Sequence, residues 1–266
     1  MNHSPFLNVM TNAAYRAGRK ARNLFENRHR LEIIEKGPND FVSSADVEVE
    51  QEIIYHLKKA HPTFGIKAEE GGNYGKDKPH NWIIDPIDGT SNFLQGIPHF
   101  ALSVALTYEE EVIAGVVYNP IMDEIFTAER GRGAFCNKHR IRVSQTGLLK
   151  EAILGTGFPH RNKKLLSPYM KSFESLFTEC RGVRRAGSAA LDLAYVAAGR
   201  FDGFWEMRLS PWDIAAGVIL VHEAGGYMTD FIGEKKHMQN GNVVAANPKM
   251  HRILLDHMRD SGLDQY

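Results

Sequence analysis

Two aspartates stand three residues apart at the end of an apolar run, a spacing at which they could share a cation. Asp85 follows the apolar stretch 82–84, and Asp88 is followed by Gly89 and Thr90. The apolar stretch predicts a buried strand, and Gly89 permits a tight turn after it. Carboxylates this close repel each other unless a cation lies between them, and paired carboxylates are typical of divalent metal sites.

Further carboxylates stand where other predicted elements begin or end. Glu69 and Glu70 follow a short predicted strand over 64–68, and Asp213 lies in the first turn of a predicted apolar helix that opens with a proline. If the strand over 64–68 is a neighbour of the strand that ends at Asp85, these acids meet at one edge of a sheet. The sequence therefore predicts a cluster of acidic side chains drawn from distant segments.

Such a cluster has a recognisable chemistry. Oxygen donors without a nearby histidine or cysteine favour Mg²⁺ or Mn²⁺ over zinc. Two such ions, ~4 Å apart, can clamp the attacking and leaving oxygens of a phosphoryl displacement. Backbone N–H groups of the turn over 88–91 would add an anion-binding site if a helix follows. Each part alone has an ordinary structural explanation as a turn or a helix start, so only the joint pattern predicts a phosphate ester as substrate.

Composition restricts the class of protein further. The 266 residues are 43% hydrophobic and 24% charged, with a formal net charge of zero. These values are typical of a globular protein, and they do not favour nucleic acid or an anionic membrane as the main partner. The N-terminus has no signal-peptide pattern and no apolar run is long enough to span a membrane, so we expect a cytoplasmic protein. Cys136 and Cys180 are expected to be free thiols.

The elements that must position these residues can be predicted from periodicity and turn formers. Helices are expected over five stretches: 5–25, 44–61, 165–180, 188–198 and 211–224. Strands are expected at 64–68, 82–85, 101–108, 112–118, 124–128, 134–136, 141–143, 151–157 and 203–207, with loops at 35–40 and 71–75. The β-rich stretch 101–143 indicates an antiparallel meander. One α+β unit over 1–266 is the simplest account, with a division into lobes at about 1–145 and 146–266 left open.

Longer motifs in the chain resemble the signatures of the inositol monophosphatase family. The segments that match are 82–93 (WIIDPIDGTSNF), 212–217 (WDIAAG) with 223–226 (EAGG), the pair Glu69-Glu70, Lys36, Asp46 and 185–193. The likeness runs from about residue 5 to 260 and is closest to the bacterial SuhB-type branch. It implies a layered α/β/α/β/α sandwich and a homodimer. It also implies a phosphatase that hydrolyses myo-inositol monophosphate, depends on Mg²⁺ and is inhibited by Li⁺.

The resemblance implies a metal-binding role for several of the acidic residues. Glu69, Asp85 and the backbone carbonyl of Ile87 would hold one Mg²⁺. Asp85, Asp88 and Asp213 would hold the second, so that Asp85 bridges the two ions. Mn²⁺ is an alternative ion, and a third, weaker ion would lie near Glu70.

Catalytic and substrate-binding roles are implied in the same way. Thr90 and Asp46 would orient and deprotonate the attacking water, Glu70 would assist them, and Lys36 would lie on a loop beside the site. The substrate would contact Asp88, Gly89, Thr90, Arg184, Gly187, Ser188, Ala189, Glu206 and Asp213. Two positions depart from the usual family pattern, because Gln95 replaces a basic, hydroxyl or Asn residue and Gly71 replaces a common Ser. Neither position is a metal ligand in the family.

Three alternatives to this function are open from the sequence. Phosphatases of the haloacid dehalogenase type also end a strand in two aspartates, but with a two-residue spacing that puts both side chains on one face. The three-residue spacing of Asp85 and Asp88 is expected to break that geometry and to favour direct attack by water over a covalent aspartyl phosphate.

The second alternative lies within the same superfamily. Sugar bisphosphatases and nucleotide 3'-phosphatases share the metal core, and the sequence does not fix the leaving group.

The third alternative is a regulatory protein with secondary phosphatase activity. Members of the SuhB-type branch are linked to RNA synthesis and processing, and Arg181, Arg184 and Arg185 form a basic cluster that could serve a protein partner, a dimer contact or neither. Direct nucleic-acid binding is not expected.

Overall fold

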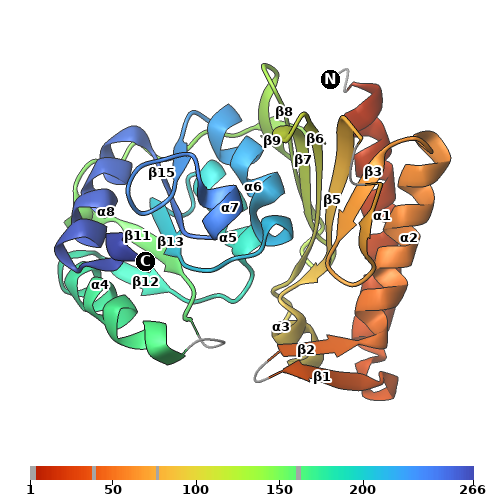
Figure 1. The fold of residues 1–266 in the computed structure, drawn as a ribbon, viewed down its shortest axis with the longest axis horizontal. Helices are drawn as coiled ribbons and strands as arrows, with labels where there is room; N and C mark the ends of the chain where they lie inside the picture. The colour runs from red at the N-terminus through yellow and green to blue at the C-terminus, as the bar shows by residue number, and fades with distance from the viewer. Residues whose placement is uncertain (1–3, 38–39, 76–77, 160–162) are drawn as a thin grey trace.

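The protein is built as alternating layers of helices and sheets (Figure 1). The structure, a computed structural model, describes residues 4–37, 40–75, 78–159 and 163–266. One helical pair covers the outer face of a large sheet, a second pair lies between this sheet and a smaller one, and a third covers the far face. These pairs are α1 (Pro5–Glu26) with α2 (Ser44–Ala60), α5 (Ala189–Ala197) with α6 (Pro211–Glu223), and α4 (Leu166–Glu179) with α8 (Pro248–Asp260). The expected α/β/α/β/α sandwich is confirmed.

Among the described residues the large sheet has eight strands in the order β10-β9-β8-β7-β6-β5-β3-β4. Strand β3 runs parallel to β5, and the strands from β5 to β10 are antiparallel, of which β6 to β9 form the expected meander. Their bounds are β3 Gly65–Ala68, β4 Gly72–Tyr74, β5 His80–Asp88, β6 Ala101–Tyr108, β7 Glu111–Asn119, β8 Glu124–Glu129, β9 Gly133–Cys136 and β10 His139–Arg140.

The smaller sheet has the order β12-β11-β13-β15-β14. Strand β11 runs parallel to both of its neighbours, β12 and β13. Strand β15 runs antiparallel to both of its neighbours, β13 and β14. The bounds are β11 Ile153–Thr156, β12 Gly182–Arg184, β13 Gly203–Glu206, β14 Tyr227–Thr229 and β15 Val243–Ala246. Other short elements are the antiparallel strands β1 (Ile33–Gly37) and β2 (Asp40–Ser43), the helices α3 (Thr90–Gln95) and α7 (His237–Asn240), and several single turns of 3-10 helix.

The helix sequences explain the layers that they occupy. Helix α1 begins as predicted, because the Ser4 hydroxyl accepts the N–H of Leu7 at 3.1 Å and Pro5 is the first helical residue. Helix α6 is apolar around almost its whole circumference, and residues 214–221 are all buried between the two sheets. In the described residues no helix is both long and apolar enough to cross a membrane. Cys136 and Cys180 are free and half-buried.

Some predicted elements differ from the observed ones. The expected loop over 35–40 contains the end of β1, with Lys36, and the start of β2, whereas Pro38 and Asn39 lie outside the described residues. The expected loop over 71–75 contains β4, and the expected strand over 141–143 is absent from the described chain. Sequence patterns also missed β14, α7, β15 and α8. Short strands such as β4 are set by pairing with a neighbour rather than by their own residues, which explains the missed strands but not the 13-residue helix α8. The division into lobes stays a prediction.

Candidate active site

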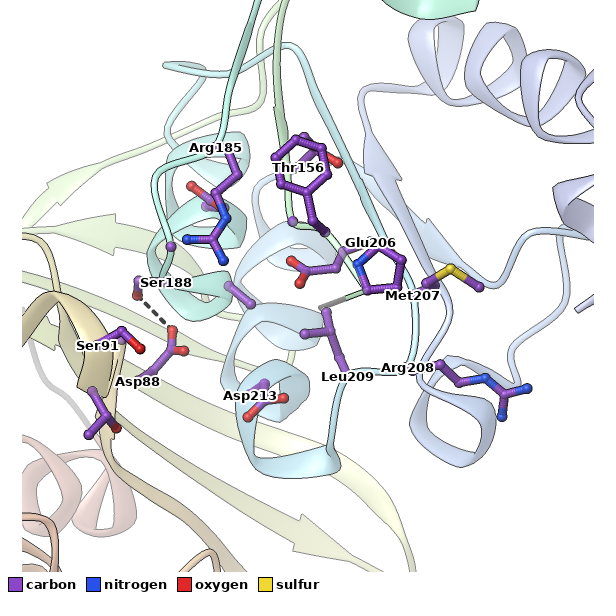
Figure 2. A pocket seen from close by; sticks show the side chains of 18 of the residues that line it. Asp88, Ser91, Thr156, Arg185, Ser188, Glu206, Met207, Arg208, Leu209 and Asp213 are labelled. Atoms are coloured by element: carbon purple, nitrogen blue, oxygen red, sulfur yellow. Dashed lines mark hydrogen bonds between the residues drawn. The ribbon is translucent and has the colours of Figure 1, made fainter. Parts of the chain in front are cut away.

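A cavity of about 440 Å³ opens between the end of β5 and the smaller sheet (Figure 2). Its wall combines segments that are far apart in the sequence: the ends of β3 and β5, the first turn of α3, the loop before α5, the end of β13 and the first turn of α6. The sequence-predicted residues on this wall are Glu69, Asp85, Ile87, Asp88, Gly89, Thr90, Gly187, Ser188, Ala189, Glu206 and Asp213.

The pairing of β3 with β5 brings the first acidic side chains together. Ala68 lies opposite Ile84 in a parallel register, and the Glu69 N–H donates to the Ile84 carbonyl at 3.2 Å. Glu69 therefore lies beside Asp85, and its negative charge adds to the effect of burial in raising the pKa of the Asp85 carboxyl group.

A β-bulge brings the second aspartate to the same wall. Between Asp85 and Asp88 the strand advances three residues while its partner β6 advances only two, from Ser103 to Ala101. Residues three apart in a regular strand face opposite sides, but one extra residue restores both side chains to one side. The expectation that the three-residue spacing separates the two carboxylates is therefore wrong, because β5 is not regular there.

The acidic side chains carry raised pKa values. Burial, and then the negative charges of Asp213, Glu70 and Asp46, raise the pKa of Glu69 to about 8. Burial, and then the charge of Glu69, raise the pKa of Asp85 well above its usual value. The folded protein thus places carboxylates where ionisation is costly and where a bound cation would relieve the repulsion.

Asp88 joins the first half of the chain to helix α5. Its Oδ2 accepts the Ser188 hydroxyl at 2.6 Å and the Ala190 N–H at 2.7 Å, so the aspartate caps the positive end of this helix. Burial raises the pKa of Asp88 to about 6, although these hydrogen bonds act in the opposite direction. The bond between Asp88 and Ser188 is drawn in Figure 2.

The turn after Asp88 brings Thr90 to a second buried acid. Gly89 has a φ of 100°, and a Cβ there would lie 3.1 Å from the Gly187 carbonyl oxygen, so the turn requires glycine. The Thr90 hydroxyl lies 3.1 Å from Asp46 Oδ1 and 3.0 Å from the Ile87 carbonyl oxygen. It has one hydrogen and can donate to only one of them at a time.

Asp46 itself lies behind Thr90, at the start of α2. Its Oδ2 accepts the Ser43 N–H at 2.8 Å and the Ser43 hydroxyl at 2.7 Å, which forms a capping box. Only 1% of Asp46 is exposed, and burial raises the pKa of its carboxyl group against the effect of these hydrogen bonds. Asp46 is thus a fixed acceptor for Thr90.

The opposite wall carries Glu206 and Asp213. Asp213 accepts the Ser210 N–H at 2.7 Å in the first turn of α6, so the prediction of a first-turn acid is confirmed. Glu206 ends β13 and packs against Gly157, where a Cβ would lie 2.0 Å from Glu206 Oε1. A side chain at Gly157 would therefore displace the Glu206 carboxylate.

Sequence reasoning missed three charged residues of the cavity wall, which are Arg185, Asp192 and Arg208. Arg184 is exposed and donates to the Val183 carbonyl, whereas its neighbour Arg185 lines the cavity. Asp192 also lines it from the first turn of α5, and its Oδ1 is buried without a hydrogen-bond partner among the described residues. Burial, and then the charge of Glu206, raise the pKa of Asp192 well above its usual value. The spacing of Asp192 one turn after Ser188 is the signal that could have found it.

The donor set of the cavity fits a hard divalent cation. As the described side chains stand, no group of three or more Asp, Glu, His or Cys residues is arranged around a common point as metal ligands. The donors nevertheless line one cavity as oxygen ligands, and burial and nearby negative charges raise the pKa values of Glu69 and Asp85, which a bound cation would lower. Carboxylate side chains reorient when they bind a metal, so these donors can close around a cation.

Comparisons with known proteins agree with this geometry. Residues 2–263 match the model of the inositol monophosphatase family. An inositol-1-monophosphatase of Mesorhizobium japonicum is 49% identical over 256 residues, which are 96% of each chain. A Vibrio cholerae protein named Nus factor SuhB is 45% identical over 259 residues, 97% of each chain. The crystal structure of the extragenic suppressor protein SuhB from Bartonella henselae superposes with a TM-score of 0.93 at 46% identity, and covers 96% of this chain and 98% of that one. The chain therefore belongs to the inositol monophosphatase family, whose members are phosphomonoesterases.

Proposed function

We propose that the chain is a Mg²⁺-dependent phosphatase that hydrolyses myo-inositol monophosphate and related polyol phosphates by direct attack of water. One observation carries the proposal: the bulge in β5 places Asp85 and Asp88 on the same cavity wall as Glu69, with Asp213 facing them from α6. Four carboxylates beside a glycine turn suit metal-assisted transfer of a phosphoryl group.

The expected metal ligands follow from this arrangement. Glu69, Asp85 and the Ile87 carbonyl would hold one ion, and Asp85, Asp88 and Asp213 the other, with a third ion near Glu70. Bound Mg²⁺ would neutralise charge on the phosphate and acidify water. We expect Mn²⁺ to substitute and Li⁺ to inhibit.

The chain's own residues would position the attacking water and the phosphate. When the Thr90 hydroxyl donates to Asp46, its oxygen is left as an acceptor toward the cavity, so it can orient a water and pass the proton to Asp46. The raised pKa of Asp46 makes it a better base for this step. The N–H groups of Gly89 and Thr90 would bind the phosphate oxygens.

The substrate's hydroxyl groups would be bound on the opposite wall. The Glu206 carboxylate can accept hydrogen bonds from a polyol, and residues 187–189 line the adjacent wall. Because Arg185 rather than Arg184 lies on this wall, we assign the predicted arginine contact to Arg185.

Purified protein would test this function directly. We expect release of phosphate from myo-inositol monophosphate with Mg²⁺, no release after chelation, and inhibition when Li⁺ is added. Initial rates should also be measured on fructose bisphosphate and on adenosine 3',5'-bisphosphate. A strong preference for either bisphosphate would replace our substrate with the corresponding alternative.

A second function deserves the same test because relatives of this chain bear the name Nus factor SuhB. We propose that the chain also serves a transcription partner, for which Arg181, Arg184 and Arg185 offer exposed positive charge next to the edge strand β12. A homodimer contact is the alternative use of this surface. Complementation of a deletion strain by the Asp88→Asn variant would separate the two functions, since a purely catalytic role requires that the variant fails.

A further inference from the structure

A buried glutamate on α2 is hydrogen-bonded to the backbone of the turn that carries Glu69 and Glu70. Glu50 is only 3% exposed, and its carboxylate accepts two successive backbone N–H groups. Its Oε2 accepts the Glu70 N–H at 2.9 Å, and its Oε1 accepts the Gly71 N–H at 2.6 Å. Hydrogen bonds to an ionised carboxylate are among the strongest in proteins, so this contact fixes the turn tightly.

The hydrogen bonds from this turn to Glu50 help to fix the direction of the Glu69 side chain. The peptide group before Glu69 is bound to β5, because the Glu69 N–H donates to the Ile84 carbonyl. The peptide group after Glu69 is bound to α2, because the Glu70 N–H donates to Glu50. With both flanking peptide groups held, the backbone dihedrals of Glu69 have little freedom, and the direction of its Cα–Cβ bond is therefore restricted.

Helix α2 thereby positions two sides of the cavity at once. Asp46 and Glu50 are four residues apart, so they lie one turn apart on the same face of the helix. Asp46 holds Thr90, and Glu50 holds the turn after β3. A Cβ at Gly71 would lie 2.7 Å from Glu50 Oε1, which explains how the carboxylate can approach this turn so closely.

We propose that Glu50 is a positioning residue that preorganises Glu69 and Glu70 for divalent-metal binding. The inference rests on the proposed function, because it concerns the metal that this function requires. Residues that orient metal ligands typically change metal affinity or activity by about 10-fold to 100-fold when they are replaced.

The full-length Glu50→Gln variant tests the proposal. Metal is first removed from the protein with a chelator, and the metal-free protein is then titrated with Mg²⁺ and with Mn²⁺ in a calorimeter. The amide keeps the length of the side chain but can accept only one of the two N–H groups. We expect metal affinity to fall about tenfold or more. Activity should show the same shift in the Mg²⁺ concentration for half-maximal rate, while kcat at saturating Mg²⁺ stays within about threefold of the parent. The matched control is Glu52→Gln on the same helix, whose carboxylate contacts His56 instead, and it should bind metal like the parent.

A second variant keeps the test decisive if Glu50→Gln does not fold. Glu50→Asp leaves every charge in place but shortens the side chain by one methylene group, so its carboxylate no longer reaches both N–H groups of the turn, and it should weaken metal binding in the same way. A folded Glu50→Gln or Glu50→Asp protein that melts earlier but binds Mg²⁺ as tightly as the parent would show a purely structural role and overturn the inference. A parent protein that binds no divalent metal would overturn the proposed function, and this inference with it.

Discussion

At the scale of single residues, the acids of the cavity are held by partners rather than left free to react. Asp88 accepts two hydrogen bonds from the start of α5, and Asp85 accepts the Ile87 N–H at 3.1 Å. Neither is poised as a nucleophile toward phosphorus, which supports attack by water even though the bulge puts both on one wall. Hydrolysis of a substrate that is chiral at phosphorus should therefore invert the configuration at phosphorus, because water attacks once, and retention would indicate two displacements through an aspartyl phosphate and contradict this mechanism.

Asp88 gives the first prediction from substitution. Asp88→Asn keeps the size of the side chain but loses the charge that a metal requires, so we expect phosphate release to fall by about 100-fold or more. Because the pKa of Asp88 is raised to about 6, the metal-free variant should be at least as stable as the parent at pH 8. Steady-state rates and urea unfolding measure the two effects. A variant with normal turnover would contradict the metal assignment.

Asp192 gives a second prediction from substitution, which concerns the stability of the protein. Its pKa is raised by burial, so the folded state disfavours the charged form and the carboxyl group lowers stability once pH exceeds its unfolded pKa. Asp192→Asn should stabilise the protein by about 1–3 kcal/mol at pH 8, and by less at pH 5. Urea unfolding at both values measures the difference. Loss of stability at pH 8 would instead indicate an ionised Asp192 paired with Arg185.

At the scale of elements, the sequence predicted most of the long periodic segments, although it missed helix α8, and it predicted short or irregular elements poorly. The helices α1, α2, α4, α5 and α6 and the meander from β6 to β9 agree with the predictions, because amphipathic or apolar patterns report directly which face is buried. The metal-ligand candidates were found for the same reason, since each ends or begins such an element. The bulge in β5 and the role of Glu50 depend on pairing between distant segments, which periodicity does not record.

Close packing around α6 gives the next prediction. Gly217 lies in the buried part of this helix, and a Cβ there would lie 2.3 Å from Leu193 Cδ1 on α5. Alanine is about 1 kcal/mol better than glycine in an exposed helix, but overpacking a core costs about 1–3 kcal/mol. We expect Gly217→Ala to destabilise the protein in urea and, by shifting α6, to lower activity through Asp213.

The control for this prediction is a double-mutant cycle. Leu193→Ala removes the atom that a Cβ at Gly217 would meet first, so Gly217→Ala should cost less in that background. Equal costs in both backgrounds, or a Gly217→Ala protein as stable as the parent, would contradict the packing argument.

At the scale of the whole molecule, the cavity is where the two sheets and their helices are joined. Besides the contact of Asp88 with α5, the Asn92 side chain donates to the Ala186 carbonyl at 2.9 Å, and the Ser103 hydroxyl donates to the Trp212 carbonyl at 3.3 Å. The acidic wall is thus assembled only when both parts of the fold are in place. Metal binding and global stability should therefore be linked, because a ligand that binds only the folded state stabilises it.

This linkage predicts how pH acts on the metal-free protein. The folded pKa of Glu69 is about 8, well above its value in the unfolded chain, so its contribution to stability is complete at low pH and is lost as pH rises through about 8. The buried histidines His237 and His251, with pKa values lowered to about 4, oppose this trend only below their unfolded values near 6.5. Between pH 7 and 9 in chelator, the free energy of unfolding should therefore fall, by at most about 1.4 kcal/mol per pH unit for this one proton.

Saturating Mg²⁺ should stabilise the protein more at pH 9 than at pH 7, since less proton release then opposes binding. Urea unfolding with and without Mg²⁺ measures both effects, and Glu69→Gln should flatten the pH dependence. Metal-free stability that rises from pH 7 to 9 would contradict the raised pKa and the crowded acidic wall behind it.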